Sequence, residues 1–214
     1  MTPAGAGLLA ACGALAPVIF TAAWVVAGFV QDGYSARREH ISGLAARSAE
    51  YPWLMMAGLL TTGLLVAAFA LALHHGVRRG SVAGPALVAL CGLGIVALGL
   101  LRNDCSSLTE ECESRVEAGE VSWQHTAHDL VSVPVFAAAI AAPLVLALRF
   151  RADPSWRSLA PFSAAAAAVL GALFALGGIE AAPSWNGVIQ RGGGLRSAPL
   201  ARGRGPPSPP ADDG

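Results

Sequence analysis

Length, composition and charge limit the class of protein at once. The chain has 214 residues, of which 54% are hydrophobic and 13% charged, and its mean hydropathy is +0.55. A soluble domain carries about 25% charged residues, so this composition excludes an ordinary soluble globular protein. The 14 basic residues, all of them Arg, balance 14 acidic residues. This zero net charge excludes a nucleic-acid-binding protein, because phosphate binding needs clustered cations.

Five stretches of the chain carry no charged residue and are 19 to 23 residues long: Leu8–Val30, Tyr51–Leu73, Ser81–Leu101, Leu130–Leu148 and Leu159–Ile179. Each is long enough to cross the hydrocarbon core, which takes about 20 helical residues. Because backbone groups need internal partners in lipid, these stretches are predicted to be helices. We therefore expect an all-α fold, a polytopic transmembrane helix bundle over residues 1–191, with the lipid bilayer as its partner and spans near 8–30, 51–73, 81–101, 125–148 and 159–179.

The connecting loops alternate in length and in density of Arg. The loops 74–80 and 149–158 are short and hold five Arg, whereas the loops 31–50 and 102–129 are longer and also hold five. Positive charge close to the span ends favours the cytoplasmic side. We expect a multi-pass protein of the cell membrane with a cytoplasmic N-terminus and with loops 31–50 and 102–129 external.

Two cysteines lie seven positions apart in the third loop, Cys105 and Cys112. They are predicted to form a disulfide, because disulfides persist outside the cytoplasm, and this agrees with an external third loop. The alternative is a pair of unpaired thiols. A zinc site at this pair is disfavoured, because no other Cys or His lies in the middle of the loop.

The C-terminal segment does not continue the pattern. Residues 192–214 hold six Gly, five Pro and three Arg, a composition that predicts a disordered tail. Five spans would leave this Arg-bearing tail outside, against the charge bias. Two explanations stay open: a native disordered tail, or an altered reading frame after Arg191 that replaces a sixth span.

Three ionisable residues open the fourth span: His125, His128 and Asp129. If this helix begins near Ser122, the spacing places all three on one face. Two imidazoles and a carboxylate can hold a divalent metal, so His125, His128 and Asp104 are candidate zinc ligands. The same residues could relay protons, or they could cap the helix and pair with loops.

Other polar residues are predicted on the same external side. Ser42, Asp104 and Asp129 are candidate catalytic groups, and the candidate ligand-binding residues are His40, Arg102, Asp129 and Glu180. A catalytic Ser42 would need a base within reach. The alternative for residues 40–44 is a short amphipathic interfacial helix with Ile41 and Leu44 on its apolar face.

Several short motifs together make the chain resemble a bacterial multi-span membrane family catalogued as domain of unknown function 998: Ile41–Leu44, Leu101–Cys105, His125–Asp129 and Trp185–Arg191. The resemblance implies six spans, with Gly187, Gln190 and Arg191 leading into a last span that this chain lacks. It implies no activity.

Three functions follow from these observations. The first is a membrane protein that binds a small or lipidic ligand, or a partner, at an external polar cluster. The second is a metal-dependent intramembrane hydrolase, in which zinc at the His/Asp site would activate water. The third is a proton-coupled transporter, in which the His pair and Asp129 would titrate.

Overall fold

The structure of the protein is a computed structural model that describes residues 2–76, 81–106 and 109–178. Within these residues every regular element is helical, and five helices are long and apolar enough to cross a membrane: α1 (Pro3–Val30), α2 (Pro52–Gly76), α3 (Ala83–Leu100), α5 (Trp123–Ala152) and α6 (Ala160–Gly178). The predicted all-α fold with five spans is confirmed. This is a membrane protein.

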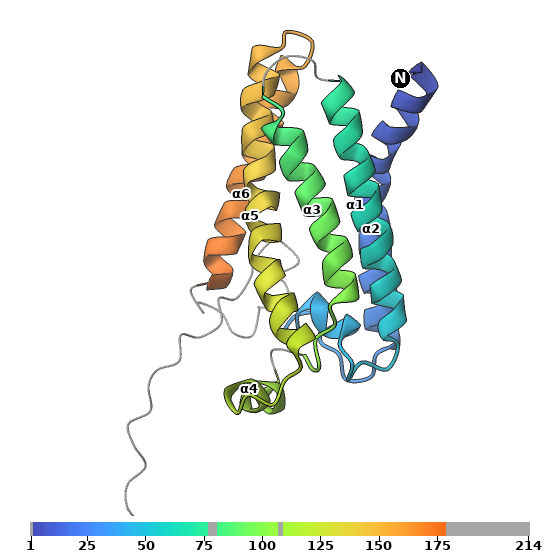
Figure 1. Ribbon diagram of the computed structural model, residues 1–214, viewed down its shortest axis with the longest axis vertical. Coiled ribbons are helices and arrows are strands. Elements are labelled where there is room, and N and C mark those ends of the chain that lie inside the picture. Colours follow the sequence, from blue (N-terminus) through green and yellow to red (C-terminus); the bar gives the residue numbers. More distant parts are fainter. Residues whose placement is uncertain (1, 77–80, 107–108, 179–214) are drawn as a thin grey trace, which may run out of the picture.

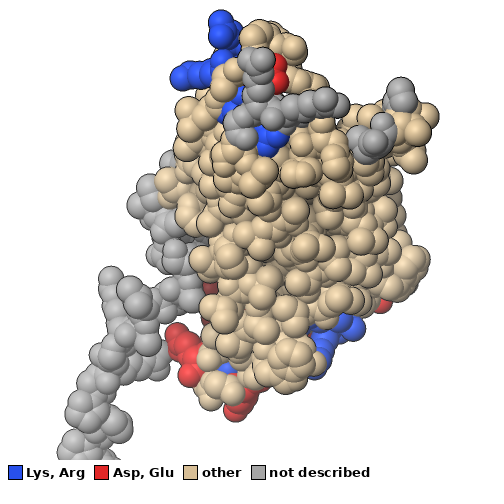
Figure 2. Space-filling model, turned by 45° about the horizontal axis from the view of Figure 1, so that its top comes forward, with Lys and Arg blue, Asp and Glu red and all other residues tan. Residues whose placement is uncertain are grey.

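The long helices pack in chain order (Figure 1). α1 packs on α2, α2 on α3, α3 on α5 and α5 on α6, so α1 and α6 form the two edges of the assembly. Large apolar side chains point outward, with Phe29 86% and Phe162 74% exposed, as expected for positions that face lipid. Figure 2 shows the sides of the molecule almost free of charge, with Arg and acidic residues at its two ends.

One end of the molecule, here named the α4 end, holds residues 31–51, 101–106 and 109–123 (Figure 1). It contains the 3-10 helix η1 (Ile41–Ala45) and the short helix α4 (Glu110–Glu117). In η1, Ile41 and Leu44 pack into a core with Ala27 and Met55, so the segment is an internal part of this end. The expected short helix is present, and its apolar face contacts protein.

The opposite end holds residues 81–83 and 149–160, together with the start of α1 (Figure 1). A 3-10 helix, η2 (Arg157–Leu159), links α5 to α6. Trp156 stacks on Phe150 with 6.1 Å between ring centroids. The predicted tail at 192–214, and Glu180 with it, lie outside the described residues.

Small residues bring α2 and α3 into close contact. A Cβ placed on Gly63 would lie 2.6 Å from the carbonyl oxygen of Gly92, and one placed on Gly92 would lie 2.5 Å from the amide nitrogen of Ala67. Gly94 likewise leaves room for the side chain of Val135 on α5. Without a hydrophobic driving force between helices in lipid, such close packing holds spans together.

We expect Gly92→Ala to destabilise the protein by about 1–3 kcal/mol, because the added methyl group overlaps backbone of α2. The matched control is Gly7→Ala on α1, where no atom lies within 4 Å of the new Cβ. Thermal unfolding in detergent measures both. An unchanged melting temperature for Gly92→Ala would show that α2 and α3 are not this close.

Candidate functional site

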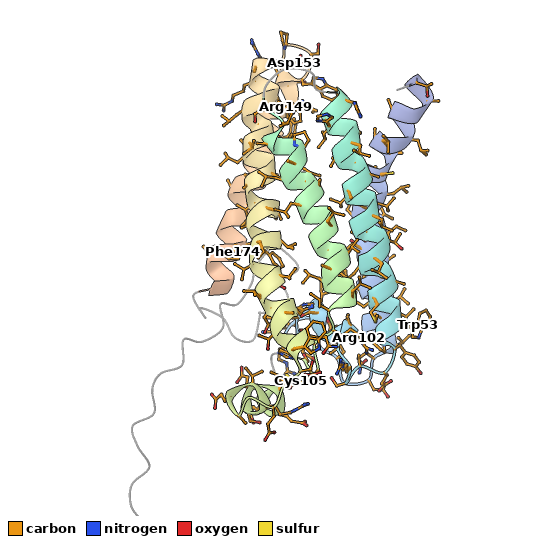
Figure 3. The ribbon with its side chains drawn as sticks, in the orientation of Figure 1. Trp53, Arg102, Cys105, Arg149, Asp153 and Phe174 are labelled. Carbon is orange, nitrogen blue, oxygen red and sulfur yellow. A yellow bond between two sulfur atoms is a disulfide. The ribbon has the colours of Figure 1, made fainter. Side chains whose placement is uncertain are left out.

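Four residues that follow α3, Arg102 to Cys105, connect the separate segments of the α4 end (Figure 3). The Arg102 guanidinium donates hydrogen bonds to the carbonyl oxygens of Ala45 and Ala46, at 3.3 and 3.2 Å. The carbonyl of Asn103 accepts a hydrogen bond from the amide of Arg47 at 2.8 Å. This segment therefore anchors the end of η1 to the end of α3.

The carboxylate of Asp104 holds the start of α5. It accepts hydrogen bonds from the Ser122 amide and, at 3.0 Å, from the Ser122 hydroxyl, and it lies 3.3 Å from Nη1 of Arg47. Ser122 is also the N-cap of α5, since its hydroxyl accepts from the His125 amide, and the helix begins near Ser122 as the shared face of the cluster required. Burial raises the pKa of the Asp104 carboxyl, but the bonds from Ser122 and the charges of Arg47 and His125 outweigh it and hold that pKa below its usual value.

The ring of His125 is 2% exposed and lies between two acidic residues. Its Nδ1 accepts a hydrogen bond from the backbone amide of Asp104 at 3.2 Å, so the proton of the neutral ring is assigned to Nε2. That Nε2 lies 3.6 Å from a carboxylate oxygen of Asp129. The predicted common face of His125 and Asp129 brings these two side chains together.

His128 is buried as well, and its Nδ1 also faces the backbone, but it faces a carbonyl oxygen and not an amide. Its Nδ1 lies 2.6 Å from the carbonyl oxygen of Leu101, so Nδ1 is assigned as the donor and Nε2 keeps its lone pair. The carbonyl of His128 accepts a hydrogen bond from Ser132 at 2.8 Å. The histidine therefore ties α5 to the end of α3, where it bonds backbone of Leu101 and Leu98.

Asn103 is the most unusual residue of this network. Its side chain is 1% exposed, and neither Nδ2 nor Oδ1 has a hydrogen-bond partner in the part of the chain that the structure describes. An unpartnered buried polar group costs about 1–3 kcal/mol. The sequence motif contains Asn103, but nothing in the sequence singled it out, since the burial of a residue between two helices depends on how distant segments pack.

The predicted disulfide between Cys105 and Cys112 is confirmed, with 5.7 Å between the Cα atoms. Cys112 lies in α4, whose N-cap Thr109 accepts from the Cys112 amide at 3.2 Å. His125 also approaches the two sulfur atoms, and the three ligand atoms lie within 4.8 Å of one another. The loop sequence could not reveal this approach, because His125 comes from the next helix.

The expected metal ligands have separate partners. The carboxylate of Asp104 contacts Ser122 and Arg47, and only its backbone amide reaches His125. Within the described residues, the one metal-type cluster is Cys105, Cys112 and His125, whose two sulfurs are already bonded to each other. The zinc set of His125, His128 and Asp104 stays a prediction.

The other candidate residues lie around this network. His40 is buried at the N-cap of η1, and its carbonyl accepts from the Tyr34 hydroxyl at 3.5 Å. Ser42 is half-buried, and no described side chain forms a hydrogen bond with its hydroxyl. A Cβ on Gly43 would lie 2.7 Å from Oγ of Ser106, so η1 also packs closely against the third loop.

Comparison with known proteins gives the family. Residues 14–197 match the model of a family described as a protein of unknown function (DUF998). The chain belongs to this family. The predicted resemblance is confirmed, and the match includes the whole network from η1 to the start of α5. No curated protein and no solved structure matches the chain. Membership of the DUF998 family supplies no activity, so the function must be argued from the network itself.

Because the pKa of Asp104 is lowered in the folded protein, its contribution to stability is complete above the usual aspartate pKa of about 3.9 and is lost as the pH falls through the folded value. We expect Asp104→Asn to lower the melting temperature at pH 7 and to flatten the loss of stability on acidification. Melting curves in detergent between about pH 7 and pH 3 measure this.

The control is Asp32→Asn, an exposed acidic residue at the same end of the molecule. It should leave both the melting temperature and its pH profile close to those of the wild type. Equal profiles for Asp104→Asn and the wild type would contradict the anchoring role of Asp104.

Proposed function

We propose that this membrane protein binds a small or lipidic ligand at the α4 end, with the side-chain amide of Asn103 as its main recognition group. The observation that carries the proposal is the burial of both amide atoms without a partner among the residues that the structure describes. Buried polar groups in native proteins are nearly always paired. A ligand with a hydrogen-bond donor and an acceptor would supply the partners that Asn103 lacks.

The surroundings define the chemical class of this ligand. Asn103 follows directly after an apolar span, at the depth where lipid headgroups and glycerol esters lie. The charged groups on either side of Asn103 have protein partners: Asp104 contacts Arg47, and the Arg102 guanidinium donates to the carbonyls of Ala45 and Ala46. A molecule with an ester or amide carbonyl and a hydroxyl group, carried on an apolar chain, fits such a site better than an ion.

The hydrolase alternative has weaker support. A catalytic zinc needs three convergent protein ligands and an open fourth position. Here the Asp104 carboxylate already accepts bonds from Ser122 and contacts Arg47. Both ring nitrogens of His125 face protein partners as well. Ligand binding requires no rearrangement of these contacts, and we therefore favour it.

Asn103→Leu tests the proposal. The variant removes the amide and keeps the number and branching of the side-chain heavy atoms, so we expect it to fold and to be as stable as the wild type once lipid is removed, or more stable. Native mass spectrometry of protein extracted gently from membranes measures co-purified lipid. The wild type should retain a bound molecule that Asn103→Leu loses.

Thr62→Val is the matched control, because the Thr62 hydroxyl is also buried without a partner among the described residues, but lies ten residues into α2. This variant should keep the bound molecule. If Asn103→Leu retains the same lipid as the wild type, or if both variants lose it equally, the proposed site is wrong.

We further propose that the α4 end lies outside the cytoplasm. The support is chemical: this end carries the disulfide, and the opposite end carries closely spaced Arg. Alkaline phosphatase, which is active only outside the cytoplasm, should be active when fused after Glu120 and inactive when fused after Asp153. The reverse pattern would contradict this orientation.

A further inference from the structure

A second unusual side chain lies at the opposite end of the molecule. Arg149, near the end of α5, is only 5% exposed (Figure 3). Its Nη1 donates a hydrogen bond to the carbonyl oxygen of Ser81 at 2.6 Å, and its Nε is buried without a partner among the described residues. A guanidinium is always charged in proteins, so a full positive charge is buried here.

No carboxylate neutralises this charge in the described part of the chain. The two ion pairs found there are Arg47 with Asp104 and His125 with Asp129, both at the α4 end. The nearest acidic residue in sequence, Asp153, accepts a hydrogen bond from the Ser155 amide at 3.1 Å. A buried charge without a counter-charge is strongly unfavourable, so an anion from outside the protein would stabilise this arrangement.

The N-terminus of α3 adds to the positive field beside Arg149. α3 is 18 residues long; its N-cap Val82 supplies no capping side-chain bond, and the hydroxyl of Ser81 accepts a hydrogen bond from the Ala83 amide at 3.1 Å. Pro85 has no N–H, so the Gly84 amide and the helix dipole remain to attract an anion, and Ser81, the partner of Arg149, lies two residues before the helix. A Cβ on Gly84 would lie 2.8 Å from the side chain of Leu146, so the first turn of α3 packs directly against α5.

The surface around this pair is basic. Arg151 and Arg157 are exposed at the same end, with Asp153 as the one acidic residue between them. Figure 2 shows blue side chains gathered at this end with little red. Such basic sites between membrane-spanning helices are suited to the phosphate groups of anionic lipids.

We propose that Arg149, together with the N-terminal turn of α3, binds a phosphate group at this end of the molecule, supplied by an anionic lipid headgroup or by free phosphate. Guanidinium and phosphate form paired, charge-assisted hydrogen bonds, which would use the Nε that no described residue bonds. This site is separate from the one around Asn103, and each can fail without the other.

The test compares lipids and anions on the detergent-purified full chain. Binding of phosphatidylglycerol and of phosphatidylcholine with matched acyl chains is measured by native mass spectrometry. Thermal stability is measured in sodium phosphate and in sodium chloride at equal ionic strength. The wild type should prefer phosphatidylglycerol. Stabilisation by phosphate as well would identify the free anion as a ligand, whereas an effect of the lipid alone would identify the headgroup.

Arg149→Gln should weaken phosphatidylglycerol binding about tenfold or more, as expected for loss of a buried charge-assisted contact. The matched control, Arg151→Gln, removes an exposed charge two residues away on the same helix and should cost about fivefold or less. Arg149→Lys keeps the charge without the planar fork, and should bind more tightly than Arg149→Gln and more weakly than the wild type.

Equal affinity of Arg149→Gln and the wild type would overturn the proposal, and so would an equal loss in Arg151→Gln. Should Arg149→Gln fail to fold, the proposal is tested by lipid and phosphate binding of the wild type, Arg149→Lys and Arg151→Gln. The absence of any preference for phosphatidylglycerol or for phosphate in the wild type would then overturn it.

Discussion

The α4 end depends on the short segment that follows α3. Each residue from Arg102 to Cys105 makes a different kind of link: guanidinium to carbonyl, backbone to backbone, carboxylate to helix N-cap, and disulfide. These links join η1, which precedes α3 in the chain, to α4 and α5, which follow it. Because each long helix packs chiefly on the next along the chain, few other contacts connect the early helices to the late ones. Residues 102–105 thus fix the positions of η1, α4 and the start of α5 relative to the end of α3.

That closure explains why the candidate site lies where it does. Once Arg102 and Asp104 have pulled the loops inward, Asn103 between them is buried with an amide that no described residue satisfies. The two histidines of α5 turn Nδ1 to backbone groups on either side of Asn103, His128 to the carbonyl of Leu101 and His125 to the amide of Asp104. A rigid frame with one unused donor and acceptor is suited to recognition, because binding then requires little ordering of the protein. At the opposite end a charged group is buried in a similar way: Arg149 forms one hydrogen bond, to Ser81, and no described carboxylate pairs with it.

The sequence predicted the parts of the fold that local physics determines. Uncharged runs of about 20 residues are long enough to span lipid only as helices. Ser122 before the His/Asp cluster predicted the start of α5, and the spacing of Cys105 and Cys112 predicted the disulfide. The short helix α4 escaped prediction, although Thr109 followed by three acidic residues in the first turn is a typical helix start.

The site itself could be predicted only in part. The composition of the cluster was visible, but its bonds were not, because Arg102 contacts backbone 56 and 57 residues away and any carbonyl could serve as that acceptor. The sequence predicted a metal shared by His125 and Asp104 from their residue types. It could not reveal that the backbone amide of Asp104 donates a hydrogen bond to the His125 ring. Asn103 and Arg149 became candidates only through burial, which depends on how distant segments close.

Ligand binding at Asn103 is tested most directly by a density map of the protein extracted with its native lipids, at a resolution that reveals ordered molecules. We expect a non-protein feature larger than a water, with a polar atom about 2.7–3.2 Å from the side-chain amide of Asn103. A protein group bonded to both amide atoms, or a lone water in that position, would contradict it.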